Sequence, residues 1–485
     1  MKYNEDINAG NADETTALSA TCQNGHIQVA QLLLDNNADI NISNIYNQNT
    51  LYFACLSGNV KLVKLLLTGD YNVDVKSRDT FGQTGLHVAC QNGHTETVKT
   101  LIEFGMDVNK KDKNDSTPLY LGWRHGCHET VKYLLDLNGQ ELNSRVDTTI
   151  TQENGWSALH VACIKGHIEV VTLLIDFGMN LNDTSNSGTP LHQACFGGQY
   201  DTVKFLLDLN GKAFNSRVNT TIKNTNRWSA LHVACLNGHI EVVKVLIDVG
   251  MNLNDTSNSG TPLHHACLGG QYETVKFLLD LNGEALNSRV DITITNTKGW
   301  SALHVACQNG HIEVVKLLID VGMNLNDASN RGTPLHHACF RGQYETVKFL
   351  LDLNGAAFNS RVDTTIKNTN GWSALHVAYQ NGHIEVVKLF IDIGMNLNDA
   401  TNSGSTPLTK ACIKGRYETR KFLLDLNGHE LNSRVDTTKK LNNGDSALHT
   451  ACINEHIEVA KILVDVGMNP NDKSNASTTP LYQAC

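Results

Sequence analysis

The sequence lacks the features that would place the protein in a membrane or on a nucleic acid. No run of apolar residues approaches the ~18 that a membrane-spanning helix requires. Lysine and arginine contribute 39 charges against 49 from aspartate and glutamate, for a formal net charge of -10. A nucleic-acid-binding protein instead needs a basic surface that neutralises phosphates. We therefore predict no membrane span and no nucleic-acid partner.

The N-terminus also lacks a secretory signal. Its opening segment, MKYNEDINAGNADETTAL, is polar and acidic and contains no apolar core. We therefore expect the protein in a reducing compartment, the cytoplasm, although the sequence does not separate the cytoplasm from the nucleus.

Motifs for catalysis and for metal binding are missing as well. The sequence has no C-x-x-C pair, no G-x-x-x-x-G-K loop, no nucleophile elbow and no kinase signature. The recurring H-x-E, as at His239 and Glu241, lacks the P-C-x-x-C half of the zinc-deaminase signature. We therefore predict that the protein is not an enzyme and holds no metal and no cofactor.

What the sequence does contain is an internal repeat. The segment S-A-L-H begins at Ser157 and returns at Ser229, Ser301, Ser373 and Ser446, and a related T-P-L segment lies between each pair of copies. The leucines of successive segments alternate between spacings of 32 and 40 residues, with a single 33. With earlier copies at Leu18, Leu51, Leu86 and Leu119, the chain holds thirteen complete units and the opening of a fourteenth.

Each unit reads as two short helices. In the unit from 188 to 215, Thr189 is a good N-cap and Pro190 suits the first helical position. We expect this helix to end near Gly197, and a second helix to follow with Val203 and Leu206 on its apolar face. One such pair cannot bury its own apolar face, so neighbouring units must stack into a continuous core.

The unit resembles the ankyrin repeat. The motifs that carry the resemblance are T-P-L-H-x-A-C at 261–267, N-G-H-I-E-V-V-K-L-L-I at 309–319 and G-x-N-x-N at 322–326. The resemblance covers residues from about 6 to 485. It implies an all-α, right-handed curved solenoid of about 13 complete helix pairs plus a partial fourteenth, with β-hairpin fingers along one edge. It also implies a monomer that binds other proteins on its concave side, through the fingers and inner helices.

The repeat spacing predicts one array over residues 1–485. In it, residues 1–14 are the end of an incomplete upstream finger, and residues 15–142 are four more divergent repeats. Residues 143–474 alternate between odd and even repeats with a 72-residue period, and residues 475–485 are a truncated last repeat. The abrupt ends favour a fragment of a longer protein or an incomplete gene model.

Every second repeat carries an insert of about seven or eight residues that begins N-S-R-V-D-T-T-I. Its β-branched residues favour extended backbone, so we expect a long finger hairpin or an ordered loop on every other repeat. The inserts contain Arg145, Arg217, Arg289, Arg361 and Arg434, and the residues that follow them are Trp156, Trp228, Trp300 and Trp372. The first interpretation is that each indole packs on its own long finger and holds it in place. Tryptophan is also enriched at binding hot spots, so our hypothesis for these residues is that they contact a partner. The two are compatible if one ring face remains open.

Cysteines and histidines follow the repeat. Twelve of the 13 cysteines occupy one repeat position. Equivalent positions in stacked repeats lie ~8–10 Å apart, beyond the ~7 Å limit for a disulfide. They are therefore expected to be small buried hydrophobic residues. The histidine that follows S/T-x-L is expected, by the resemblance, to bond to the Ser or Thr that opens its helix.

These observations predict a non-enzymatic scaffold or adaptor that binds proteins along its concave surface. One alternative is the targeting arm of a larger enzyme, such as a ubiquitin-ligase adaptor or a kinase-linked protein, or of a channel, whose other domain is absent from this chain. Another is a structural spring with no specific partner.

Overall fold

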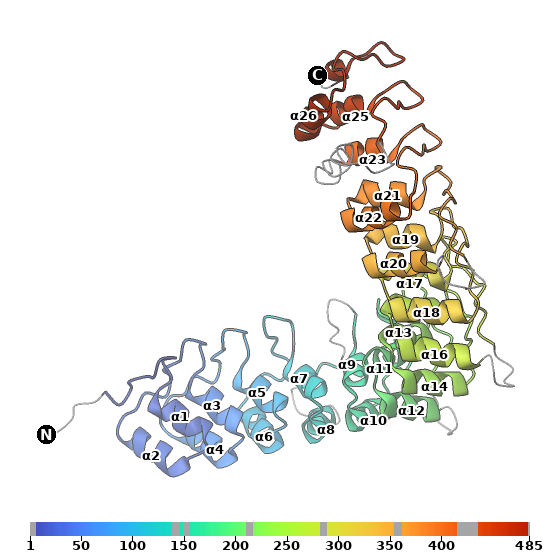
Figure 1. The fold of residues 1–485 in the computed structure, drawn as a ribbon. Coiled ribbons are helices and arrows are strands. Elements are labelled where there is room, and N and C mark those ends of the chain that lie inside the picture. The colour runs from blue at the N-terminus through green and yellow to red at the C-terminus, as the bar shows by residue number, and fades with distance from the viewer. Residues whose placement is uncertain are drawn as a thin grey trace. The chain divides into compact units, whose positions relative to one another are not determined.

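The computed structural model describes residues 6–137, 146–148, 155–209, 217–281, 289–353, 361–414 and 435–483. All regular secondary structure in these ranges is helical. Figure 1 shows that the helices lie in pairs, with the first helices in one row, the second helices in another, and the connecting loops extending beyond the first helices. The predicted all-α fold is confirmed.

The chain forms two compact units, residues 1–230 and 231–485. The first helices of the N-terminal unit are α1 (Ala17–Gln23), α3 (Thr50–Ser57), α5 (Gly85–Gln91), α7 (Pro118–His125), α9 (Ala158–Lys165) and α11 (Pro190–Phe196). Its second helices are α2 (Ile27–Asp35), α4 (Val60–Thr68), α6 (Thr95–Glu103), α8 (His128–Asp136), α10 (Ile168–Asp176) and α12 (Tyr200–Asp208). The end expected for the helix that begins at Pro190 is confirmed.

The C-terminal unit repeats this order. Its first helices are α13 (Ala230–Asn237), α15 (Pro262–Gly269), α17 (Ala302–Asn309), α19 (Pro334–Arg341), α21 (Ala374–Asn381), α23 (Pro407–Ile413), α25 (Ala447–Ile453) and α27 (Pro480–Gln483). The first residue of α13, Ala230, is the last residue of the N-terminal unit. Its second helices are α14 (Ile240–Asp248), α16 (Tyr272–Asp280), α18 (Ile312–Asp320), α20 (Tyr344–Asp352), α22 (Ile384–Asp392) and α26 (Ile457–Asp465).

The core of each unit lies between the two rows of helices. In α20, Val347 and Leu350 are 0% and 1% exposed. The equivalent residues of the other second helices are buried in the same way, except in α2 and α26, the first and last of them, where Leu33 and Ala460 are partly exposed.

The repeat cysteines lie on the first helices, as Cys339 does at 0% exposure, and the described cysteines form no disulfide. Burial raises the pKa of the Cys339 thiol well above its ordinary value. Ten of the repeat cysteines are small apolar core residues, as predicted, whereas Cys452 is only partly buried. Cys485 lies outside the described residues.

A buried histidine at the start of each typical first helix joins its repeat to the next one. His336 Nδ1 accepts from the Thr333 amide at 3.2 Å and lies 2.9 Å from the Thr333 hydroxyl, which completes a capping box. Because Nδ1 is an acceptor, Nε2 carries the proton and donates to the Trp372 carbonyl at 3.0 Å. The expected bond to the helix-opening residue is therefore confirmed, and the same ring also links two repeats.

A second polar residue connects each repeat to the preceding one. His383, directly before α22, donates from Nε2 to the Phe340 carbonyl at the end of α19, over 3.2 Å. Gln343 occupies the same position before α20 and donates to the Gln308 carbonyl over 3.1 Å. Histidine and glutamine therefore make the same link in alternate repeats, because both present an N–H at similar reach.

An asparagine ladder fixes the register of successive fingers. Asn326 donates from Nδ2 to the Arg361 carbonyl and accepts the Asp363 amide at Oδ1, both over 2.8 Å. Asn182 and Asn254 make the equivalent pairs of bonds in other repeats. This ladder ties the base of each long finger to the repeat before it.

The structure places the extra residues of every second repeat differently from the expected insert. Asn180 and Asn219 are equivalent, because the Oδ1 of each accepts an amide two residues on. Only residues 177–179 separate Asn180 from the end of α10, whereas residues 209–218 separate Asn219 from the end of α12. The extra residues therefore precede the finger, and the V-x-T-T segment forms the turn that ordinary repeats also have. Among the described residues the fingers contain isolated β-bridges and no paired strands.

We expect Asn326→Ala to lower the free energy of unfolding by about 1–2 kcal/mol, because two backbone groups lose a partner that water replaces incompletely. Asn326→Asp retains the acceptor for Asp363 and loses the donor to Arg361, so its loss should be smaller. Urea unfolding measures both variants. Equal stability of Asn326→Ala and wild type would show that the ladder does not stabilise the fingers.

Candidate functional site

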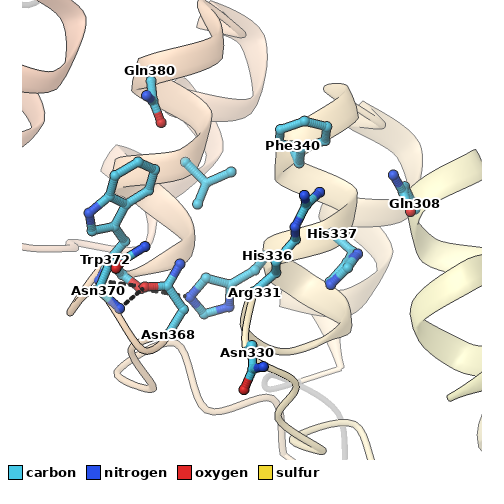
Figure 2. A pocket seen from close by; sticks show the side chains of 11 residues that line it. Gln308, Asn330, Arg331, His336, His337, Phe340, Asn368, Asn370, Trp372 and Gln380 are labelled. Atoms are coloured by element: carbon cyan, nitrogen blue, oxygen red, sulfur yellow. Dashed lines mark hydrogen bonds between the residues drawn. The ribbon is translucent and has the colours of Figure 1, made fainter. Parts of the chain in front are cut away.

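The candidate site is a pocket in the C-terminal unit, between the finger loops and the first helices α19 and α21. It encloses about 250 Å³. Figure 2 shows Phe340, His336 and His337 on the α19 side of this opening and Trp372 and Gln380 on the α21 side. Phe340 is 41% exposed, so an aromatic face remains open to a ligand.

The pocket is neutral at its centre and positively charged at its rim. Burial lowers the pKa of His336 to about 4 and that of His337 to about 3, so both rings are uncharged at neutral pH. Arg331, on the finger that precedes α19, is exposed and supplies the positive charge. The residues that line the pocket include no carboxylate.

The tryptophans lie at the base of the fingers. The rings of Trp300 and Trp372 contact side chains of the following repeat. Trp300 is 8% exposed and makes an edge-to-face contact with His337, with ring centroids 4.5 Å apart. The Trp372 ring lies under the Lys410 ammonium, 4.1 Å from its centroid. Trp156, Trp228 and Trp372 are half-buried. For Trp300 and Trp372, a packing partner is therefore the first helix of the following repeat, which sequence reasoning did not consider.

The backbone of each such tryptophan is also part of a turn. Asn296 donates its amide to the Trp300 carbonyl over 2.9 Å, and its Oδ1 accepts the Trp300 amide over 3.1 Å. His264 Nε2 donates to the same carbonyl over 3.0 Å. The tryptophan position therefore joins three consecutive repeats: that of His264, its own, and that of His337.

The arginines lie at the start of the finger turns. Arg217, Arg289 and Arg361 have exposed side chains, and their carbonyls accept the asparagine ladder described above. Arg145 and Arg434 lie outside the described residues. That these arginines and the tryptophans contact a partner stays a prediction.

Sequence reasoning missed the residues that make this pocket distinctive. Arg331 stands where sibling repeats have Ser187 and Ser259, and Lys410 stands where they have Gln193 and His265. These two substitutions in otherwise near-identical repeats could have identified the site from the sequence. If packing alone determined such a position, the same residue would return in every repeat.

The described part of the chain contains no group of three or more histidine, cysteine or acidic side chains placed to hold a metal ion. None of its helices is long and apolar enough to cross a membrane.

Comparison with curated proteins gives short matches. Protein phosphatase 1 regulatory subunit 27 of Homo sapiens is 38% identical over 66 residues, which are 14% of this chain and 43% of that protein. The subunit of the same name from Mus musculus is 38% identical over 57 residues, which are 12% of this chain and 37% of that protein. The chain thus spans less than half the length of each curated relative.

Solved structures and a family model give wider coverage. The ankyrin repeat domain of human ASB11 matches 45% of this chain and 90% of its own, with 28% identity and a TM-score of 0.37. The ankyrin repeat domain of Bcl-3 matches 47% of this chain and 95% of its own, with 27% identity and a TM-score of 0.38. The model for three copies of ankyrin repeats matches residues 1–79, 51–146, 140–218, 212–289, 282–362, 357–435 and 426–485. The chain therefore belongs to the ankyrin-repeat family, whose members are typically non-catalytic and whose repeats mediate protein–protein interaction.

Proposed function

We propose that this chain is a scaffold or adaptor that binds partner proteins through its first helices and fingers. The observation that carries the proposal is the pocket between α19 and α21, in which exposed Phe340 and half-buried Trp372 lie on opposite sides. Aromatic residues in such partly enclosed sites are the usual anchors of protein interfaces. Trp156, Trp228 and Trp300, with the finger arginines, supply further contacts along the repeats.

Phe340→Ala should reduce capture of partner proteins from a cell lysate about tenfold, because truncating an anchor residue costs an interface more than 1 kcal/mol. Affinity capture followed by mass spectrometry measures the loss. The matched control is Glu345→Ala on the exposed face of α20, which should capture the same proteins as wild type. Thermal unfolding of both variants must match wild type within a few degrees.

The proposal fails if Phe340→Ala and Glu345→Ala capture the same proteins in the same amounts as wild type. A loss confined to Glu345→Ala would place the partner on the second helices instead.

We also propose that the repeats form one array over residues 1–485 and act as a monomer in the cytoplasm. Light scattering coupled to size-exclusion chromatography should give a mass near 53.2 kDa. The alternative is that this chain is a targeting arm of a larger enzyme or channel. Its support is the similarity to a phosphatase regulatory subunit, which matches 14% of this chain.

A further inference from the structure

Charge is segregated between the two rows of helices in the C-terminal unit. The second helices α14, α16, α18, α20, α22 and α26 each carry two carboxylates and one lysine. The first helices of this unit carry no carboxylate in their described residues, and they include Arg341 and Lys410. The first helices beside the pocket therefore contribute no negative charge of their own.

Several finger carboxylates of this unit already have partners within the chain. Asp399 pairs with Lys367 and Asp472 with Lys440, each with N–O distances of 2.7 Å. Further aspartates accept both the amide and the hydroxyl of a threonine two residues on; these are Asp291, Asp363 and Asp436. They are therefore poor counter-charges for the cations beside the pocket.

Arg331 and Lys298 form no ion pair with a described carboxylate. Instead the Lys298 ammonium lies 4.9 Å from the Trp300 ring centroid and the Arg331 guanidinium 5.8 Å from it. Such contacts hold a cation in place without neutralising it. A guanidinium held this way keeps its hydrogen-bond donors for a planar anion such as a carboxylate.

The pocket beside Arg331 offers an apolar space next to that charge. Phe340, Val377 and the Trp372 ring line it, together with side-chain amides such as that of Gln380. Its volume of about 250 Å³ suits one large apolar side chain. The amides can bond to the backbone of an extended segment that passes over the opening.

From this geometry we infer that the pocket binds an acidic, extended segment of a partner protein. An aromatic side chain of that segment enters between Phe340 and Trp372, and a neighbouring carboxylate bonds to Arg331. The inference rests on the proposed function and adds the chemical class of the partner. A long polyanion such as RNA fits less well, because the acidic second helices repel it over its whole length.

The test uses three fluorescein-labelled dodecapeptides and the full chain, with binding followed by fluorescence anisotropy. The first peptide contains glutamates, glycines and one central phenylalanine. The second has alanine in place of the phenylalanine, and the third has lysines in place of the glutamates. We expect the first to bind about tenfold more tightly than either of the others, and to weaken as salt is raised from 50 to 300 mM.

Arg331→Ser should weaken binding of the first peptide about tenfold, because it removes a charge-assisted contact. Serine is the residue of the sibling repeats at Ser187 and Ser259, so the finger should fold unchanged. Lys348→Ser on α20 removes the same charge from an exposed position of the other row and should leave the affinity unchanged.

The inference is overturned if the acidic phenylalanine peptide does not bind, or if the lysine peptide or a labelled polyuridylate 12-mer binds as tightly. It is also overturned if Arg331→Ser and Lys348→Ser weaken binding equally. None of these outcomes decides the proposed function, which depends on whether Phe340→Ala reduces capture of natural partners. The two failures are therefore distinguishable.

Discussion

Lowering the pH from 7 to 5 is expected to remove several kcal/mol of stability from the C-terminal unit. Burial lowers the pKa of His264, His336 and His376 from the ordinary 6.5 to about 4. His265 and His337, beside them, have pKa values lowered further, to about 2 and about 3. All of these rings are neutral in the folded protein and must take up protons when it unfolds.

The direction follows from which state binds the proton. A histidine whose pKa is lower in the folded protein binds fewer protons there than in the unfolded chain, so stability rises with pH. The stabilisation is complete above about pH 6.5 and is lost progressively as the pH falls toward about 4. At pH 5 each ring with a folded pKa near 4 has lost about 2 kcal/mol, on the order of 6 kcal/mol for three of them. A typical domain has only about 5–15 kcal/mol in total.

Urea unfolding at pH 7, 6 and 5, followed by circular dichroism, measures the effect. The finger aspartates, such as Asp363, have pKa values lowered by their bonds to threonine, so they stay ionised over this window. The fall in midpoint between pH 7 and 5 therefore reports the histidines. A midpoint that stays constant over that range would show that the rings are not buried as neutral groups.

His336→Thr is the matched variant for this measurement. The chain already has threonine at this position of another repeat, where Thr409 bonds to the Thr406 carbonyl over 2.8 Å. The variant loses the link to the Trp372 carbonyl, so it starts less stable at pH 7. Its stability should then fall less steeply than that of wild type, by about 2 kcal/mol between pH 7 and 5. A parallel fall would mean that other groups control the acid response.

The sequence was sufficient for those features of the fold that depend on local chemistry. Thr189 and Pro190 predicted where α11 begins, because capping needs only residues within one turn. The regular return of the leucines predicted two rows of stacked helices, because each pair alone leaves an apolar face exposed.

Features that depend on contacts between repeats could not be predicted. The V-x-T-T segment was expected to lengthen the finger, because nothing local distinguishes it as a strand from the same segment as a turn. Its equivalence to the turn of ordinary repeats shows in the amides that Asn180 and Asn219 accept at Oδ1. The contact of Trp300 with His337 joins residues of different repeats. The pocket at Arg331 is visible in the sequence only as a departure from Ser187 and Ser259.

Gly342→Ala is expected to lower the free energy of unfolding by about 2–4 kcal/mol, although it adds a single methyl group. Gly342 ends α19 with φ at 71°, a left-handed conformation that costs a residue with a Cβ about 1–2 kcal/mol. Its added Cβ would also overlap the imidazole of His383. Moving that ring breaks the bond from its Nε2 to the Phe340 carbonyl, which connects the two repeats.

Gly322→Ala separates these two causes. Gly322 has φ at 89°, and an added Cβ meets no atom within 4 Å, so the stability lost in Gly322→Ala should be the backbone cost alone, about 1–2 kcal/mol.

A double-mutant cycle of Gly342→Ala with His383→Ala then isolates the contact, because removing the ring relieves its overlap with the added Cβ. We expect the double variant to be at least 1 kcal/mol more stable than the sum of the single losses predicts. Additive losses, or equal losses for Gly342→Ala and Gly322→Ala, would show that glycine is needed there for its backbone conformation only. The stability of a stacked array depends on the interfaces between neighbouring repeats. A larger loss of stability in Gly342→Ala than in Gly322→Ala would therefore show that the absence of a side chain at Gly342 lets the next repeat pack closely against α19.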